Sequence, residues 1–96
     1  MRIQPNETII TGAWNVLDGR AVADEAARRI EELVHSYLRF IGTDESGWDR
    51  LYQDPADKRY WELSYPEGHL HGGGPPQLRV IVASEARQKY GYIEEG

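Results

Sequence analysis

Residues 47–65 of the chain read GWDRLYQDPADKRYWELSY and decide the fold. Two arms rich in aromatic residues, 48–53 and 60–65, flank the turn sequence DPADK at 54–58. Aromatic side chains suit a pleated surface. Pro55 presets the φ angle at the first corner of a type I turn, and Asp54 can accept hydrogen bonds from the amides that follow it. The stretch therefore predicts a β-hairpin.

Successive side chains of a strand point to opposite faces of a sheet, which assigns the second arm two different surfaces. One face carries three large residues that we expect in the core, namely Trp61, Leu63 and Tyr65. The other face carries Tyr60, Glu62 and Ser64, and we expect it to be a polar, aromatic outer face.

The N-terminal part predicts a second hairpin. Ile9–Leu17 is strand-like, Asp18-Gly19 is a strong two-residue turn signal, and Arg20–Ala23 is the return arm. Gly12 within the first arm indicates a bulge or a close approach of two backbones. We expect Trp14 to be in the core, because large aromatic residues at alternating positions usually pack there.

Two helices complete the prediction. The first runs from Asp24, which can cap it, to Ile41, with Gly42 as its stop. Its apolar stripe, which we expect to cover a sheet, consists of Ile30, Leu33, Val34, Tyr37, Leu38 and Ile41. Near the C-terminus, Leu78–Ala83 predicts a strand and Ser84 caps a short helix to about Tyr90. The sequence thus predicts an α+β fold: an antiparallel sheet of about five short strands, one long helix packed on a face, and a short C-terminal helix.

Composition narrows the class of protein. The 96 residues predict a single domain, 1–96, with 40% hydrophobic and 28% charged residues, as in ordinary globular proteins. No apolar run approaches the roughly 20 residues that span a bilayer, and the N-terminus lacks the pattern of a signal peptide. The absence of cysteine fits a reducing compartment, so we expect a cytoplasmic protein. The net charge of -5 disfavours nucleic acid and membrane surfaces as partners and favours a basic protein.

The candidates for catalytic or cofactor chemistry are weak. His69 and His71 could share a metal, but no further histidine is near them in the sequence. The glycine run 72–74 lacks the Lys and Ser/Thr of a phosphate-binding loop. Asp49, Asp54 and Asp57 offer carboxylates for acid–base chemistry without a partnered histidine or nucleophile. We expect no cofactor, no metal and no enzymatic activity.

The same carboxylates suit a protein-binding surface better. Aromatic residues near the hairpin could stack nucleotide bases, but the charge around them is mainly acidic. An acidic and aromatic surface fits a protein ligand of opposite charge. The candidate binding residues are Asp44, Glu45, Asp49, Asp54, Asp57, Tyr60 and Glu62.

Several unusual strings give the chain a resemblance to a known family. They are PNET at 5–8, DE at 24–25, DESGW at 44–48, LYQDP at 51–55, RYWELSYP at 59–66 and HGGGPP at 71–76. Together they span nearly the whole chain, which resembles the immunity protein 27 family of bacterial polymorphic toxin systems. Two positions depart from the family pattern: Lys58, where members often have glycine, and Glu32, in place of a tryptophan.

The resemblance implies a function but supplies no catalytic residues. Members are encoded beside toxins and are thought to neutralise them in the producing cell. This chain would then bind one cognate toxin, for which a basic nuclease is one candidate, through the acidic and aromatic surface. The alternatives are a generic protein-interaction module and, less favoured, a small hydrolase using Asp49, Asp54 or His71.

Overall fold

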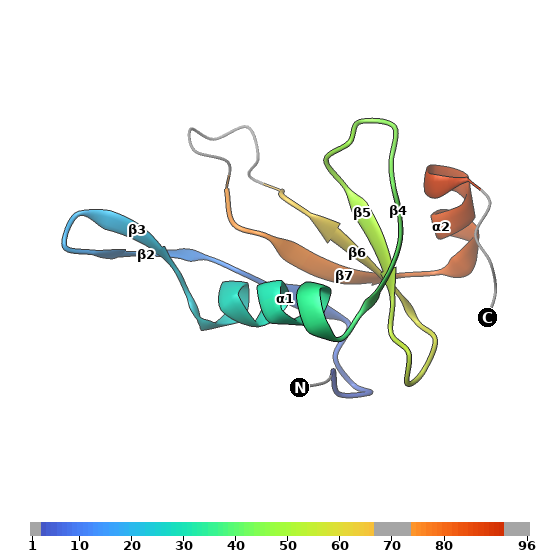
Figure 1. The fold of residues 1–96 in the computed structure, drawn as a ribbon, viewed down its shortest axis with the longest axis horizontal. Helices are drawn as coiled ribbons and strands as arrows, with labels where there is room; N and C mark the ends of the chain where they lie inside the picture. The colour runs from blue at the N-terminus through green and yellow to red at the C-terminus, as the bar shows by residue number, and fades with distance from the viewer. Residues whose placement is uncertain (1–2, 67–73, 92–96) are drawn as a thin grey trace.

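The computed structural model describes residues 3–66 and 74–91 and has an α+β fold (Figure 1). The two helices are α1 (Glu25–Ser36) and α2 (Ala83–Tyr90). The strands are β1 (Ile9–Thr11), β2 (Trp14–Leu17), β3 (Arg20–Ala23), β4 (Arg39–Thr43), β5 (Arg50–Gln53), β6 (Tyr60–Ser64) and β7 (Gln77–Ile81). The predicted fold class is therefore confirmed.

Five strands form one antiparallel sheet in the order β1-β7-β6-β5-β4. At its centre is the hairpin predicted from residues 47–65, with Arg50 opposite Leu63 and Gln53 opposite Tyr60. Lys58 closes its turn with a φ angle of +68°, in the left-handed region that favours glycine. This strain costs about 1 kcal/mol.

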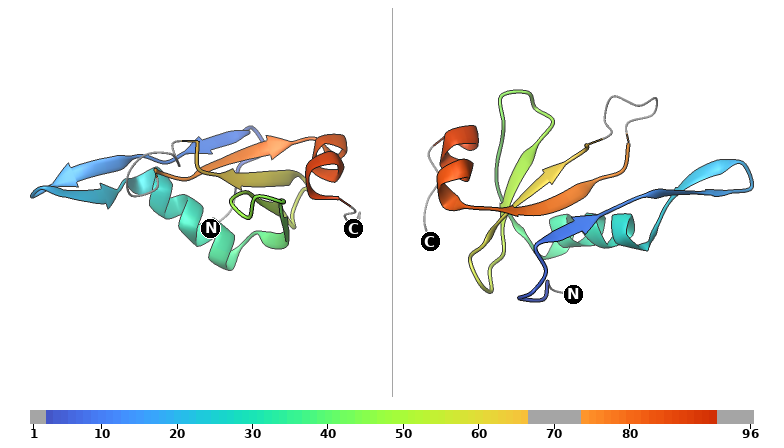
Figure 2. Two further views of the ribbon diagram at one scale, coloured as in Figure 1. Left: turned by 90° about the horizontal axis from the view of Figure 1, so that it is seen from above. Right: turned by 180° about the vertical axis from the view of Figure 1, so that it is seen from behind.

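Strands β2 and β3 form a separate two-stranded ribbon that extends beyond the main sheet (Figures 1 and 2). Asp18 and Gly19 both have positive φ, as the two-residue turn requires. Before the ribbon, Gly12 lies so close to α1 that a Cβ atom on it would be 2.9 Å from the Ala27 Cβ. The predicted close approach is confirmed. The prediction that Trp14 lies in the core is wrong: it is 44% exposed, because the ribbon extends past the sheet that would cover it.

Helix α1 begins as predicted but ends earlier. The Asp24 carboxylate accepts a hydrogen bond of 2.8 Å from the Ala27 amide, which caps the first turn. The helix stops at Ser36, and the predicted continuation to Ile41 is wrong because Arg39–Thr43 pairs with β5 as strand β4. Gly42 does not end a helix; it follows an irregularity in the register of β4.

Each face of the sheet is partly covered by a helix. The packing of α1 on one face was predicted, whereas that of α2 on the other face was not. On one face Ile30 and Leu33 of α1 pack in a core with Trp61 and other buried residues. On the opposite face Ala86 of α2 packs with a second set of buried residues, namely Leu51, Tyr60 and Ile81. Figure 2 shows α1 along one side of the sheet and α2 at the end of β7.

The second core overturns the predicted outer face of β6. Tyr60 and Glu62 are only 7% and 3% exposed, because α2 covers them. Trp61 and Leu63 are buried as predicted, but Tyr65 is 38% exposed, since α1 does not reach over the end of β6. Ser84 does not cap α2: the helix starts at Ala83 after Val82 and has no side-chain cap. The helix ends at Tyr90, about where predicted, and Gly91 follows it with a positive φ.

Candidate functional site

The loop between β4 and β5, residues 44–49, is held rigidly by its own hydrogen bonds; we call it the acidic loop. One carboxylate oxygen of Asp44 accepts from the Ser46 hydroxyl at 2.7 Å and from the amides of Gly47 and Asp49. The Asp44 amide donates back to the Asp49 carbonyl at 3.0 Å. The hydrogen bond from Ser46, aided by the backbone donors, lowers the pKa of Asp44. The loop is therefore ordered before any partner arrives.

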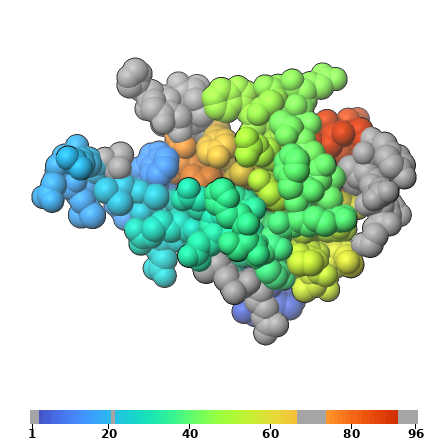
Figure 3. Space-filling view, viewed as in Figure 1, coloured from blue at the N-terminus to red at the C-terminus, as the bar shows by residue number. Residues whose placement is uncertain are grey.

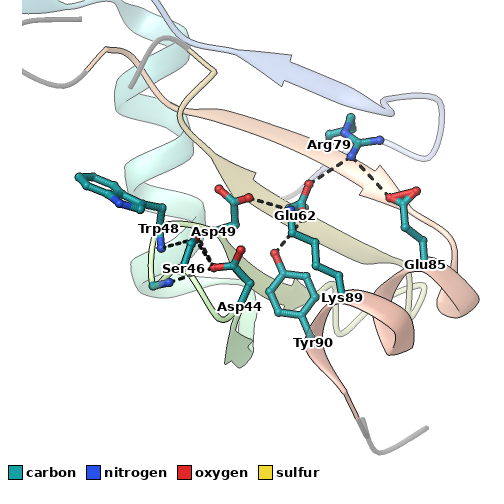
Figure 4. A network of polar contacts seen from close by, with 10 residues as sticks. Asp44, Ser46, Trp48, Asp49, Glu62, Arg79, Glu85, Lys89 and Tyr90 are labelled. Atoms are coloured by element: carbon teal, nitrogen blue, oxygen red, sulfur yellow. Dashed lines mark hydrogen bonds and ion pairs between the residues drawn. The ribbon is translucent and has the colours of Figure 1, made fainter. Parts of the chain in front are cut away.

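The acidic loop contains a tryptophan, Trp48, whose ring takes no part in the hydrogen bonds that order the loop. Trp48 is 67% exposed, and its backbone amide is fixed by a 3.1 Å hydrogen bond to the Ser46 hydroxyl. In Figure 4 its ring points away from the polar network behind the loop. Glu45 is also exposed. Trp48 and Glu45 are thus exposed to solvent on a loop whose backbone is held by hydrogen bonds.

Behind the loop, Lys89 joins it to the buried face of the sheet (Figure 4). The Lys89 ammonium lies 2.7 Å from a carboxylate oxygen of Asp49 and 2.7 Å from one of Glu62. Glu62 also accepts hydrogen bonds from the Tyr90 hydroxyl at 2.9 Å and from Arg79 at 3.1 Å. These contacts fasten α2 to the base of the acidic loop.

The polar contacts of Glu62 keep its carboxylate charged in spite of burial. Burial acts to raise its pKa, but the hydrogen bonds from Lys89, Tyr90 and Arg79 outweigh that effect and the pKa lies below its ordinary value. Burial also acts to lower the pKa of Lys89, yet the bonds to Asp49 and Glu62 leave it raised. Burial and the contact with Glu62 raise the pKa of the Tyr90 hydroxyl. These shifts favour a charged Glu62 carboxylate, a charged Lys89 ammonium and a neutral Tyr90 hydroxyl, the states in which the three groups bind one another.

The seven residues predicted as a binding surface do not lie together. Asp44, Glu45 and Asp49 belong to the acidic loop, whereas Asp54 and Asp57 lie in the β5–β6 turn at the opposite end of β5 (Figure 1). The remaining two, Tyr60 and Glu62, are buried under α2.

The two carboxylates of the β5–β6 turn, Asp54 and Asp57, bond to other groups of the protein. Asp54 is fully buried and accepts hydrogen bonds from the Tyr37 hydroxyl at 2.7 Å and the Ala56 amide at 2.8 Å. Asp57 is exposed and bound to Arg59 at 2.6 Å. The expectation that Asp54 belongs to an accessible surface is therefore wrong, because this buried carboxylate ties Tyr37, the residue after α1, to the turn.

Sequence reasoning missed Trp48 as a surface residue. The sequence signal was Gly47, which follows the polar residues 43–46 and indicates a turn directly before Trp48. In the structure Gly47 has a φ of +81°, and β5 begins only at Arg50. A large aromatic at the tip of a polar loop is better placed for a partner than for a core.

The residues that the structure describes contain no candidate metal site. Within 3–66 and 74–91, no three His, Cys, Asp or Glu side chains are grouped so as to hold a metal ion. His69, His71, Gly72 and Gly73 lie outside the described residues. In the same described part of the chain, no helix is long and apolar enough to cross a membrane.

Tryptophan is enriched among the residues that carry binding energy in protein interfaces, so exposed Trp48 on the acidic loop favours a protein-binding domain. Comparison with protein families identifies which kind: residues 16–82 match the family described as Immunity protein 27. The match covers more than two thirds of the 96 residues. The chain therefore belongs to the immunity protein 27 family, as its sequence resemblance implied. Neither a search of curated proteins nor one of solved structures found a match.

Proposed function

We propose that this protein binds one cognate bacterial toxin and neutralises it in the cytoplasm of the cell that makes both. The observation that carries the proposal is membership of the immunity protein 27 family. We place the binding surface at the acidic loop, with Trp48 and Glu45 as contact residues and Asp44 and Asp49 as their support.

The loop has the physical properties of a good interface anchor. Immobilising a flexible loop or side chain on binding costs free energy, and a loop already ordered by Asp44 and Ser46 avoids much of that cost. Tryptophan is among the residues that most often carry binding energy, because its large ring can be fully desolvated in a pocket of the partner. Trp48 and Glu45 therefore combine an apolar anchor with a negative charge.

Charge favours a basic partner. The net charge of -5 attracts a positively charged toxin over a distance, and complementary charge raises association rates and selects partners. Nucleases bind phosphate backbones with basic surfaces. A nuclease toxin is thus the partner class that this surface suits best, and the protein would act by occupying a surface rather than by a chemical step.

The test uses the toxin domain encoded next to this chain's gene, made catalytically inactive for binding and active for growth assays. Co-expression of the wild-type protein should rescue growth, and the purified proteins should bind. Trp48→Ala should raise Kd about 30-fold or more, the size expected of a hot spot. Glu45→Lys should slow association at low salt and have less effect at high salt.

The matched control is Glu32→Lys, which reverses an exposed charge on α1, away from the loop. If the loop is the interface, this variant should rescue growth and bind the toxin with a Kd within about twofold of the wild-type value. Absence of both binding and rescue by the wild-type protein would refute the proposed function. Normal binding by folded Trp48→Ala and Glu45→Lys would refute the proposed surface and leave the function standing.

A further inference from the structure

A groove of about 540 Å³ lies on the side of the sheet that α1 covers. One wall is the side of α1, the floor is formed by β4, β5 and β6, and the base of the β2–β3 ribbon lines one end. Four aromatic residues from these separate elements line it, namely Trp14, Phe40, Tyr52 and Tyr65. Figure 3 views this side and shows strand atoms exposed between α1, in teal, and the β4–β5 region, in green.

The groove exists because α1 covers only part of the sheet. The helix packs against β1 and β7, at one edge, while β4 and β5 form the other edge. The register places Phe40 beside Tyr52 on the α1 side, and their rings meet edge to face at 5.6 Å. Tyr52 is buried, but Phe40 is 56% exposed. The aromatic surface therefore continues past the core into solvent.

The exposed aromatics are not needed to complete the core. The buried cluster on this face is closed by residues such as Trp61, Leu63 and Leu78, each less than 5% exposed. Phe40, Trp14 and Tyr65 stand outside it and are brought to one concave surface from three different elements. Concave, mainly apolar surfaces with a few polar groups are the usual form of binding sites.

Two charges of opposite sign lie in the groove. Glu31 is on the helix wall, and Arg50 is on the strand floor. Neither has a hydrogen bond or an ion pair with any residue of the described ranges 3–66 and 74–91. A bound segment that carries a cation near Glu31 and a carboxylate near Arg50 would satisfy both.

The groove is also continuous with the acidic loop. Thr43 and Arg50, which line the groove, are the residues at which the strands meet the loop 44–49. A partner that contacts Trp48 and Glu45 can therefore enter the groove without a change in the fold. This continuity favours one partner for both surfaces.

We infer that the groove receives an apolar side chain of the toxin, carried on a segment with a basic residue facing Glu31 and an acidic residue facing Arg50. The inference rests on the proposed function and adds to it the chemistry of the partner's contact. The acidic loop then provides the first contact, and the groove fixes the orientation of the toxin.

The test measures binding of the same inactive toxin domain to variants of the groove. Phe40→Ala should raise Kd at least about tenfold, mainly through faster dissociation, because an apolar anchor acts after encounter. Arg50→Glu and Glu31→Lys should each weaken binding about fivefold or more, by placing like charges together. The controls are Ile9→Ala and Val82→Ala, which shorten exposed apolar side chains outside the groove and should bind within about twofold of wild type.

Circular dichroism melts of each variant separate loss of binding from loss of folding, and the two charge variants test the groove even if Phe40→Ala unfolds. If the toxin binds wild type, is weakened by Trp48→Ala and is unaffected by all three groove variants, the groove inference is wrong and the proposed function stands. If wild type does not bind the toxin, both are overturned.

A second copy of the chain is the competing occupant. Light scattering should find the wild-type protein monomeric at the concentrations used for binding. A dimer that Phe40→Ala or Arg50→Glu converts to monomers would assign the groove to self-association and overturn the inference.

Discussion

The ion pair between Glu7 and Arg29 joins the N-terminal segment to α1 and offers a quantitative test of the structure. The two terminal guanidinium nitrogens of Arg29, Nη1 and Nη2, lie 2.7 and 2.8 Å from the two carboxylate oxygens of Glu7. The Gln4 amide donates a further hydrogen bond of 2.8 Å to the same carboxylate. The Arg29 hydrogen bonds, followed by the one from Gln4, lower the pKa of Glu7 from 4.5 to about 2.

A pKa lowered by about 2.5 corresponds to at most about 3.4 kcal/mol of stability at neutral pH, at about 1.36 kcal/mol for each tenfold change. The Glu7 side chain is 25% exposed, so solvent screens the pair. We therefore expect a coupling of about 1–2 kcal/mol. Because the folded pKa is the lower one, this stability is present above pH 4.5 and is lost as the pH falls towards 2.

A double-mutant cycle measures this coupling directly. Urea unfolding of the wild type, Glu7→Gln, Arg29→Met and the double variant at pH 7 should give about 1–2 kcal/mol, and at pH 3 less than half of that value. Glu32→Gln, which removes an exposed carboxylate from the same helix, is the control and should change stability by less than about 0.5 kcal/mol. A coupling near zero at pH 7, or one of equal size at both pH values, would refute the reasoning.

Two further predictions concern the two faces of the sheet. Trp61→Ala and Leu63→Ala should each lower the free energy of unfolding by about 2–5 kcal/mol as buried truncations, and denaturant melts within about 0.5 kcal/mol of wild type would contradict their burial. Lys89→Met should lower it by about 2–3 kcal/mol by leaving the buried Glu62 carboxylate with only Arg79 and Tyr90 as partners. The same melts at pH 7 check this, and a change of less than about 0.5 kcal/mol would contradict the role of Lys89.

Features that depend on a few neighbouring residues could be predicted from the sequence. The β5–β6 hairpin follows from Asp54 and Pro55, and the β2–β3 hairpin follows from Asp18-Gly19, because turn geometry restricts backbone angles locally. The Asp24 cap is equally local. Each of these predictions needed no knowledge of what packs against the segment.

The errors arose where a distant element decides the outcome. Tyr60 and Glu62 were assigned to an outer face, but α2, more than 20 residues later, covers them. Alternation along β6 correctly separated its two faces and contained no information on whether the second face was covered. The predicted end of α1 was wrong for a related reason. Leu38 and Ile41 continue the helical spacing, but residues 39–43 pair with β5 and so belong to the sheet.

The candidate site shows why the number of acidic residues overstates the charge available to a partner. Asp49 and Glu62 are paired with Lys89, Asp57 is paired with Arg59, and Asp54 is buried. Paired charges of opposite sign largely cancel at the distances over which a partner is steered. Many carboxylates of the predicted surface thus serve to hold the structure in shape.

Long-range attraction from the loop itself then rests mainly on Asp44 and Glu45, since neither forms an ion pair with a residue of the described chain. Asp44 is committed to loop hydrogen bonds but retains its negative charge. With only two such charges, we expect the association rate to depend only modestly on the salt concentration. In the proposed complex, the larger share of the affinity would come from desolvated apolar area, which this protein offers at Trp48 and in the adjoining aromatic groove. In the proposed complex, the acidic residues would hold the surface in shape and the aromatic residues would make the contacts.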